Sequence, residues 1–73
     1  MSTDCTFKTV LLDSGRNKVA VIKATRDLTG LSLVAAKDLV DGAPAIILDG
    51  VDEHEAEVGK QILEDLGADA TIG

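Results

Sequence analysis

The stretch that decides the fold is NKVAVIKATRDLTGLSLVAAKDLVDGAP, residues 17–44. Its apolar residues recur at helical spacing, and the Thr-Gly pair in its middle and the Gly-Ala-Pro triplet at its end interrupt that pattern. We therefore predict two consecutive helices. They leave cations around Ile22 on an outward face, an arrangement that suits binding another protein and supplies no catalytic group.

The first helix is predicted over residues 18–28. Asn17 can cap its start, and Thr29-Gly30 can close it. The helical repeat divides its residues into two stripes. The stripe expected to face the core consists of Val21, Ala24, Thr25 and Leu28, and the outward stripe consists of Lys18, Val19, Ile22, Lys23 and Arg26.

The second helix is predicted from about Ser32, which can cap it, to Gly42. Pro44 then prevents the helix from continuing and suits the first residue of an edge strand. The inner stripe is expected to consist of Leu33, Ala36, Leu39 and Val40, and the outward stripe of Val34, Lys37, Asp38 and Asp41.

The flanking sequence supplies a third helix and three strands. Three short apolar segments bounded by turn residues are predicted strands: residues 7–12, 45–48 and 68–72. The third helix is predicted over residues 53–66, where Asp52 and Glu55 form a capping-box pattern. Gly59 inside this helix costs about 1 kcal/mol relative to alanine, so a close packing contact is expected there.

The resulting order is β-α-α-β-α-β in one domain that spans residues 1–73. A three-stranded antiparallel sheet with three helices layered on one face gives an α+β fold. Residues 1–6 are expected to form a flexible N-terminal segment.

Composition indicates one small soluble domain, because 73 residues with an apolar fraction of 45% suffice for one core. No apolar run approaches the ~20 residues of a membrane span. The start, MSTDCTFK, lacks the pattern of a signal peptide. The single Cys5 agrees with a reducing compartment, so a cytoplasmic protein is expected.

The net charge of −6 is unevenly distributed. Residues 1–40 contain six Lys or Arg and four Asp or Glu, whereas residues 41–73 contain one Lys and nine Asp or Glu. Such a split can orient the molecule in the field of a charged partner. Alternatively, the acidic half is only a solvated helix surface.

The sequence contains no catalytic constellation. His54 stands among acids at a helix start and is expected to be a solvated surface histidine, and Cys5 has no evident base. The glycines form neither a dinucleotide-binding nor a phosphate-binding loop. We therefore expect a protein that is not an enzyme and that uses no cofactor or metal. Direct nucleic-acid binding is also disfavoured, because the negative charge repels phosphate and no exposed aromatic side chain is available to stack on bases.

The outward face of the first helix is the candidate site. Lys18, Ile22 and Arg26 follow one another at intervals of four residues, and Lys23 flanks them. An aliphatic side chain supplies desolvated contact, while cations orient the partner and speed association. Alternatively, Ile22 packs inward and the cations are ordinary solvated charges. Periodicity alone does not separate these two interpretations.

The segments NKVAVIK, TGL, AKDLV and AP occur together here. With them, the chain resembles the C-terminal domain of the bacterial ribosomal stalk protein, an acidic multi-copy protein of the large subunit. The similarity begins at Phe7 and continues through Asp49-Gly50-Val51, Ala56-Glu57 and Leu66-Gly67-Ala68, so it covers nearly the whole chain. It implies the same β-α-α-β-α-β fold.

In that family the domain recruits and helps to activate the GTPases of translation, including elongation factors Tu and G, and holds no nucleotide itself. The contact surface lies on the first two helices. The resemblance therefore implies a protein-binding site at Lys18, Val19, Ile22, Lys23, Arg26, Leu33 and Lys37. Val34 belongs to the same face but stands where the family usually has a lysine, so the patch becomes more apolar. Thr25 replaces a typically small or apolar residue, and Gly59 stands where a large aliphatic residue is common.

The full family protein also has an N-terminal dimerisation domain, which anchors it to the ribosome, and a flexible hinge. Six residues precede Phe7 here and show neither. We therefore expect an excised domain or a freestanding homologue that contacts ribosomes only indirectly and contacts no membrane. It should be mostly monomeric, with a weak dimer through the Val34 patch as the alternative. A freestanding copy would bind translation factors in trans, or it would serve as a structural or interaction module in a non-ribosomal assembly.

Overall fold

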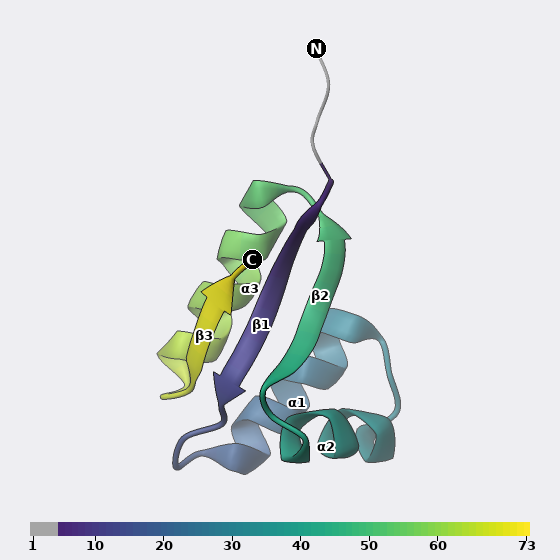
Figure 1. Cartoon of the computed structure of the whole chain (residues 1–73). Coiled ribbons are helices and arrows are strands. Elements are labelled where there is room, and N and C mark those ends of the chain that lie inside the picture. Colours follow the sequence, from purple (N-terminus) through teal and green to yellow (C-terminus); the bar gives the residue numbers. More distant parts are fainter. Residues whose placement is uncertain (1–4) are drawn as a thin grey trace.

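The computed structural model describes residues 5–73, which form a sheet and helices in the predicted order (Figure 1). The elements are β1 (Phe7–Asp13), α1 (Lys18–Thr29), α2 (Leu33–Asp41), β2 (Ala45–Val51), α3 (Glu53–Asp65) and β3 (Asp69–Ile72). This β-α-α-β-α-β order confirms the predicted α+β class. The prediction of a flexible N-terminal segment falls, for residues 1–4, outside the described residues.

The strands form an antiparallel sheet in the order β2-β1-β3, with β1 in the centre. Along β1, Thr9 and Leu11 are fully buried. This alternation is typical of a strand with one face on the core. α3 packs on β1 and β3, and α1 packs on β2 and against α2 (Figure 1). The helices therefore cover one face of the sheet and leave the other open.

β2 is longer than predicted. The pattern predicts an end at Leu48, because Asp49-Gly50 is typical of a turn. In the structure Gly50 has a φ of 68°, and the strand continues to Val51, which pairs with Phe7. The register of β1 against β2 shifts next to Phe7, and this irregularity accommodates the glycine inside the strand.

Side-chain caps are present at the starts of α2 and α3, as predicted. Ser32 Oγ accepts a hydrogen bond from the backbone N–H of Ala35 at 3.2 Å, and Asp52 Oδ1 accepts one from Glu55 at 2.7 Å. At the start of α1, Asn17 occupies the N-cap position, as predicted, but its side chain makes no capping hydrogen bond.

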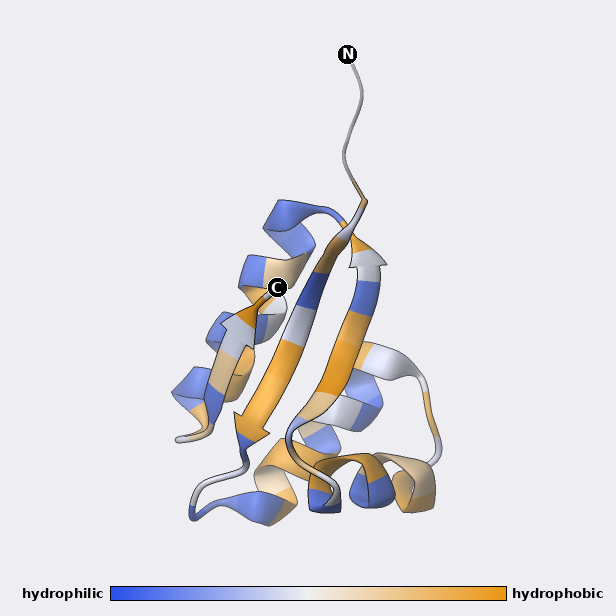
Figure 2. Ribbon diagram, in the orientation of Figure 1, coloured by the Kyte–Doolittle hydropathy of each residue, from blue (hydrophilic) through white to orange (hydrophobic). Residues whose placement is uncertain are grey.

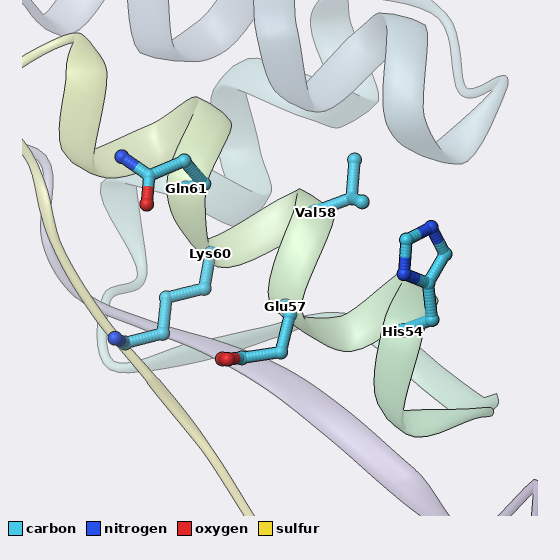
Figure 3. A pocket seen from close by; sticks show the side chains of 5 residues that line it. All are labelled: His54, Glu57, Val58, Lys60 and Gln61. Atoms are coloured by element: carbon cyan, nitrogen blue, oxygen red, sulfur yellow. The ribbon is translucent and has the colours of Figure 1, made fainter.

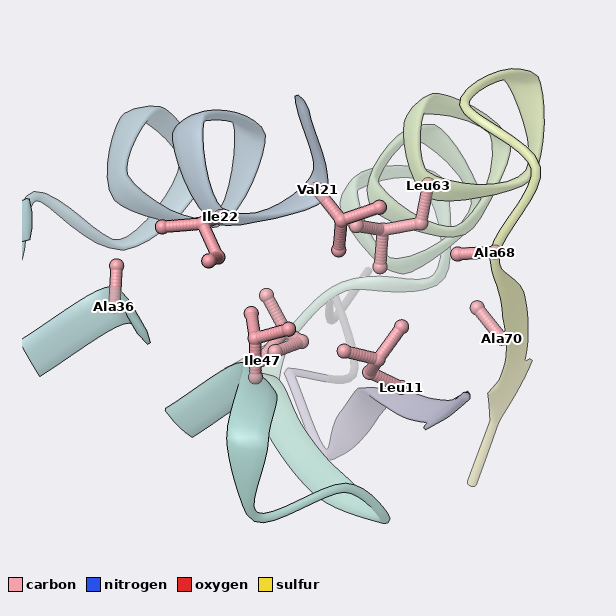
Figure 4. Packing of buried hydrophobic residues seen from close by; sticks show 9 residues of the cluster. Leu11, Val21, Ile22, Ala36, Ile47, Leu63, Ala68 and Ala70 are labelled. Carbon is pink, nitrogen blue, oxygen red and sulfur yellow. The ribbon is translucent and has the colours of Figure 1, made fainter. Parts of the chain in front are cut away.

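The core lies between the sheet and the helices (Figure 4). Its buried apolar members are Leu11, Val21, Ile22, Ala36, Val40, Ile47, Leu63, Ala68 and Ala70. Two positions contradict the predicted stripes: Ile22 is only 8% exposed, and Leu33, expected to face inward, is 49% exposed. Ile22 is buried because α1 contacts both α2 and β2, so the buried arc of α1 is wider than one stripe.

Gly59 lets α3 approach the sheet closely, as predicted. A Cβ at this position would lie 2.8 Å from Leu48 Cδ1 and 3.3 Å from Thr9 Oγ1. The Thr9 hydroxyl donates a hydrogen bond to the Ala56 carbonyl at 2.8 Å, and this bond fixes the Thr9 side chain beneath α3. The Leu48 side chain thus occupies the space that a larger residue at position 59 would need.

Candidate protein-binding face on helices α1 and α2

A short connection joins α1 to α2 and leaves the chain little freedom there. Gly30 adopts a φ of 74°, the left-handed conformation that glycine tolerates best, and ends α1. The Thr29 hydroxyl donates to the Thr25 carbonyl at 2.7 Å and accepts from the Leu31 N–H at 3.2 Å. These bonds order the end of α1 and the connection. α1 packs against α2, and the two helices form a hairpin whose outer side is the candidate face.

The apolar part of this face is open to solvent. Val19, Leu33 and Val34 are 65%, 49% and 70% exposed. Leu31 adjoins them in the connection and is also exposed. Helical periodicity cannot identify Leu31, because it lies between the helices; its apolar character within the Thr-Gly-Leu turn is the available signal. Burying such side chains against a partner would remove apolar surface from water, which favours association.

Two of the predicted cations are paired within the domain. Lys18 Nζ forms an ion pair with Asp41 Oδ1, and Lys37 Nζ lies 3.1 Å from Asp41 Oδ2. Hydrogen bonding from Lys18, and then from Lys37, lowers the pKa of the Asp41 carboxyl below its ordinary value, because both cations stabilise the ionised form. All three side chains remain accessible to water, which screens the pairs.

Lys23 and Arg26 supply the charge that is more available to a partner. Lys23 is exposed and takes part in no ion pair within residues 5–73. Arg26 Nε lies 3.8 Å from Asp27 Oδ1, beyond hydrogen-bonding distance, and both side chains are well exposed. An acidic surface of a partner can therefore meet these two cations without displacing a strong internal contact.

Ile22 lies beneath the face rather than on it. Its side chain belongs to the buried cluster that includes Ala36 of α2 and Ile47 of β2 (Figure 4). The prediction of Ile22 as an outward anchor is therefore wrong, and the alternative, inward packing, holds. The other predicted site residues are all exposed: Lys18, Val19, Lys23, Arg26, Leu33, Val34 and Lys37.

A depression on α3 offers no comparable site. It measures about 270 Å³, and Figure 3 shows the side chains that line it: His54, Glu57, Val58, Lys60 and Gln61. Each of them is exposed or half-buried, so the depression does not exclude water.

Within residues 5–73, His, Cys, Asp and Glu side chains form no group of three that could hold a metal ion. No helix in the described part of the chain is both long and apolar enough to cross a membrane.

Comparison with known proteins assigns the family. The family model that describes the ribosomal protein L7/L12 C-terminal domain matches residues 7–73 of this chain. The chain belongs to this family. This confirms the resemblance to the stalk-protein domain that the NKVAVIK and AKDLV segments indicate.

Individual ribosomal relatives agree with the L7/L12 assignment. The chain is 56% identical over 66 residues to large ribosomal subunit protein bL12 of Burkholderia thailandensis. It is 58% identical over 62 residues to the bL12 protein of Burkholderia mallei. These matches cover 90% and 85% of this chain but 53% and 50% of the two relatives, so the chain spans about half their length.

Proposed function

We propose that this L7/L12 C-terminal domain is a non-enzymatic module that binds translational GTPases through the face formed by α1 and α2. The observation that carries the proposal is the exposed apolar group of Val19, Leu33 and Val34 on the same hairpin as Lys23 and Arg26. Family membership supports the choice of partner, because the relatives are ribosomal proteins.

The two kinds of side chain divide the work of binding. The aliphatic groups lose water on contact and supply affinity, and the cations attract an acidic surface and set its orientation. The face is small, so the buried area falls below the ~1,200 Å² of a standard interface. We therefore expect weak, rapidly reversible binding, with partners that include elongation factors Tu and G. The module would work in the cytoplasm and meet the ribosome through its factors.

Titration of the isotope-labelled domain with each elongation factor tests this function. Amide signals within residues 18–37 should shift while those of β3 stay in place. Val34→Asp should weaken binding, because it puts a charge into the apolar group. Val58→Asp is the matched control, since Val58 is an exposed valine on α3, and it should leave binding unchanged. The absence of any shift within residues 18–37 at high factor concentration would reject the proposal.

A second candidate is an interaction module of a non-ribosomal assembly, and Val34 favours it. This residue is 70% exposed, apolar, and stands where the family usually has a lysine. Val34→Lys restores the usual cation and separates the two candidates. If translation factors are the partners, they bind the natural domain, which has Val34. If the valine serves another partner, the translation factors bind the Val34→Lys variant but do not bind the natural domain.

A further inference from the structure

The middle stretches of β1 and β2 consist mainly of hydrophobic residues (Figure 2). Because Thr9 and Leu11 point into the core, the alternation of β1 puts Val10 and Leu12 on the open face. Leu12 is 45% exposed. Solvent-facing sides of antiparallel sheets are usually polar, so this face departs from the expected pattern.

The register extends the apolar centre across all three strands. Val10 lies opposite Ile46 of β2 and opposite Thr71 of β3, so these three residues form a row perpendicular to the strands. Ile46 is 45% exposed and Thr71 is exposed as well. The row is therefore a continuous contact surface, centred on β1, that no helix or strand among residues 5–73 covers.

Charged side chains lie at both ends of the open face. At one end Lys8 faces its cross-strand neighbour Asp49. At the other end lies Asp69, which alternates with the buried Ala70 and is exposed. One end of the face thus carries an opposite-charge pair, Lys8 with Asp49. The other end is acidic, because the exposed Asp13 lies opposite Asp69.

The edges of the sheet are poor sites for adding a strand. β3 has four residues, and β2 has an irregular register where Ile47 is left between the partners of Thr9 and Val10. Short and bulged edge strands resist pairing with another chain. A partner of this surface therefore packs on the open face instead of extending the sheet.

We propose that the open face binds a second copy of this domain, in a two-fold dimer whose facing sheets have antiparallel strands. The axis runs along the row of Ile46, Val10 and Thr71, so each of these side chains meets its own counterpart, as a two-fold interface requires. This geometry lays Lys8 over Leu12 of the second copy, with Asp69 of that copy beside it. The lysine stem covers the leucine, and its ammonium group meets the carboxylate.

The charges select this arrangement over the alternative. If the strands of the two sheets ran in the same direction, Lys8 would face Lys8 and the two acidic ends would meet. Like charges close to each other across the interface repel and so destabilise the contact. The antiparallel arrangement instead brings opposite charges together at both ends.

The size of the face sets the strength of the dimer. Three strands spaced about 4.8 Å apart, with seven residues that rise about 3.3 Å each, give a face of roughly 14 by 23 Å. The dimer therefore buries roughly 650 Å² in total, below the ~1,200 Å² of stable complexes. Each copy also carries a net charge of −6, which opposes association until salt screens it. The dimer is weak, forms at high protein concentration and moderate salt, and leaves the α1–α2 face of both copies free.

A spin label on Cys5 tests the contact and its direction. Cys5 is exposed and is the only cysteine of the chain, and it lies two residues before β1. Spin-labelled natural-abundance protein is mixed with isotope-labelled Cys5→Ser protein, so that all broadening is intermolecular. Broadening centred on Leu12 and Asp69 supports the proposal. Broadening centred on Phe7 and Lys8 overturns the strand direction, broadening centred on α1 and α2 assigns association to the other face, and no broadening at high concentration overturns the dimer.

Substitution of the apolar row gives a second, independent test. Ile46→Lys should abolish the concentration-dependent shifts of β1 and β3 amides, and its own spectrum shows whether it remains folded. Val34→Lys is the matched control, because it makes the same kind of change on the α1–α2 face and should leave those shifts intact. A loss of the shifts in Val34→Lys but not in Ile46→Lys would overturn the proposal. Factor binding does not depend on this result, so the two proposals fail separately.

Discussion

Asp41, the last residue of α2, forms an ion pair with Lys18, the first residue of α1. The same carboxylate accepts a hydrogen bond from Lys37, one turn earlier on α2, at 3.1 Å. One acid therefore links the two ends of the hairpin and holds two cations of the proposed binding face. A partner that recognises these cations must compete with Asp41 for them.

Asp41→Asn should make association with an acidic partner faster and more dependent on salt. The change frees Lys18 and Lys37, and exposed charges act mainly on the association rate, which salt screens. The rate is measured by stopped-flow mixing with elongation factor G over a range of ionic strength. Asp38→Asn is the control, since Asp38 is exposed on the same helix and forms no ion pair within residues 5–73. Equal effects of the two variants would mean that only net charge matters.

The ion pairs should also give a pH dependence of defined sign. A carboxyl whose pKa is lowered by folding stabilises the fold above its unfolded pKa, and this contribution is lost as the pH falls through the folded pKa. Because the pKa of Asp41 is lowered from its ordinary value of 3.8, the contribution should be complete at neutral pH. It should decline as the pH falls below the ordinary value and disappear in stronger acid, once the pH is below the folded pKa. The difference in unfolding free energy between the natural domain and Asp41→Asn is the measured quantity. A difference that persists unchanged into strong acid would contradict the assignment.

Ile22→Ala should destabilise the domain by about 2–4 kcal/mol, because it opens a cavity in the core. Val19→Ala should cost less than about 0.5 kcal/mol, since Val19 is 65% exposed. Urea unfolding of both variants measures the two losses. Similar small losses in the two variants would place the Ile22 side chain on the surface and restore the interpretation of Ile22 as an outward anchor.

Local signals predict most of this fold. The apolar periodicity of each helix lies within the helix itself, and the caps at Ser32 and Asp52 directly precede the helices they start. The order of elements therefore follows from neighbouring residues alone. The exposed cations of α1 can also be predicted from the local sequence. Even the pair of Lys37 and Asp41 follows from their spacing of four residues on one helix.

Long-range packing determines what the sequence could not predict. Ile22 sits at the border of two helical stripes, and only the joint contact of α1 with α2 and β2 decides that it is buried. The reason for Gly59 lies in Thr9 and Leu48, which come from two different strands. The pairing of Lys18 with Asp41 likewise depends on how the hairpin closes, which no local repeat specifies.

Gly59→Leu should destabilise the domain by about 1–3 kcal/mol through overpacking, even though leucine favours the helix by about 1 kcal/mol. Leu48 Cδ1 lies where the new side chain must go. Leu48→Ala in the same chain should therefore recover part of the loss, because it vacates that space. A double-mutant cycle in urea measures the coupling, and additive free energies would show that the two side chains do not share the site.

Thr25→Val should stabilise the domain by about 1 kcal/mol. Thr25 is fully buried, and its hydroxyl has no hydrogen-bond partner among the described residues, so it carries the cost of an unsatisfied polar group. Valine keeps the shape and removes that group. Thr9→Val is the matched comparison: Thr9 is also fully buried, but its hydroxyl donates to the Ala56 carbonyl at 2.8 Å, so the same change should cost about 1 kcal/mol. The free energy of unfolding, measured in urea, should therefore rise for Thr25→Val and fall for Thr9→Val. A loss of stability in Thr25→Val would mean that the Thr25 hydroxyl finds a hydrogen-bond partner in solution.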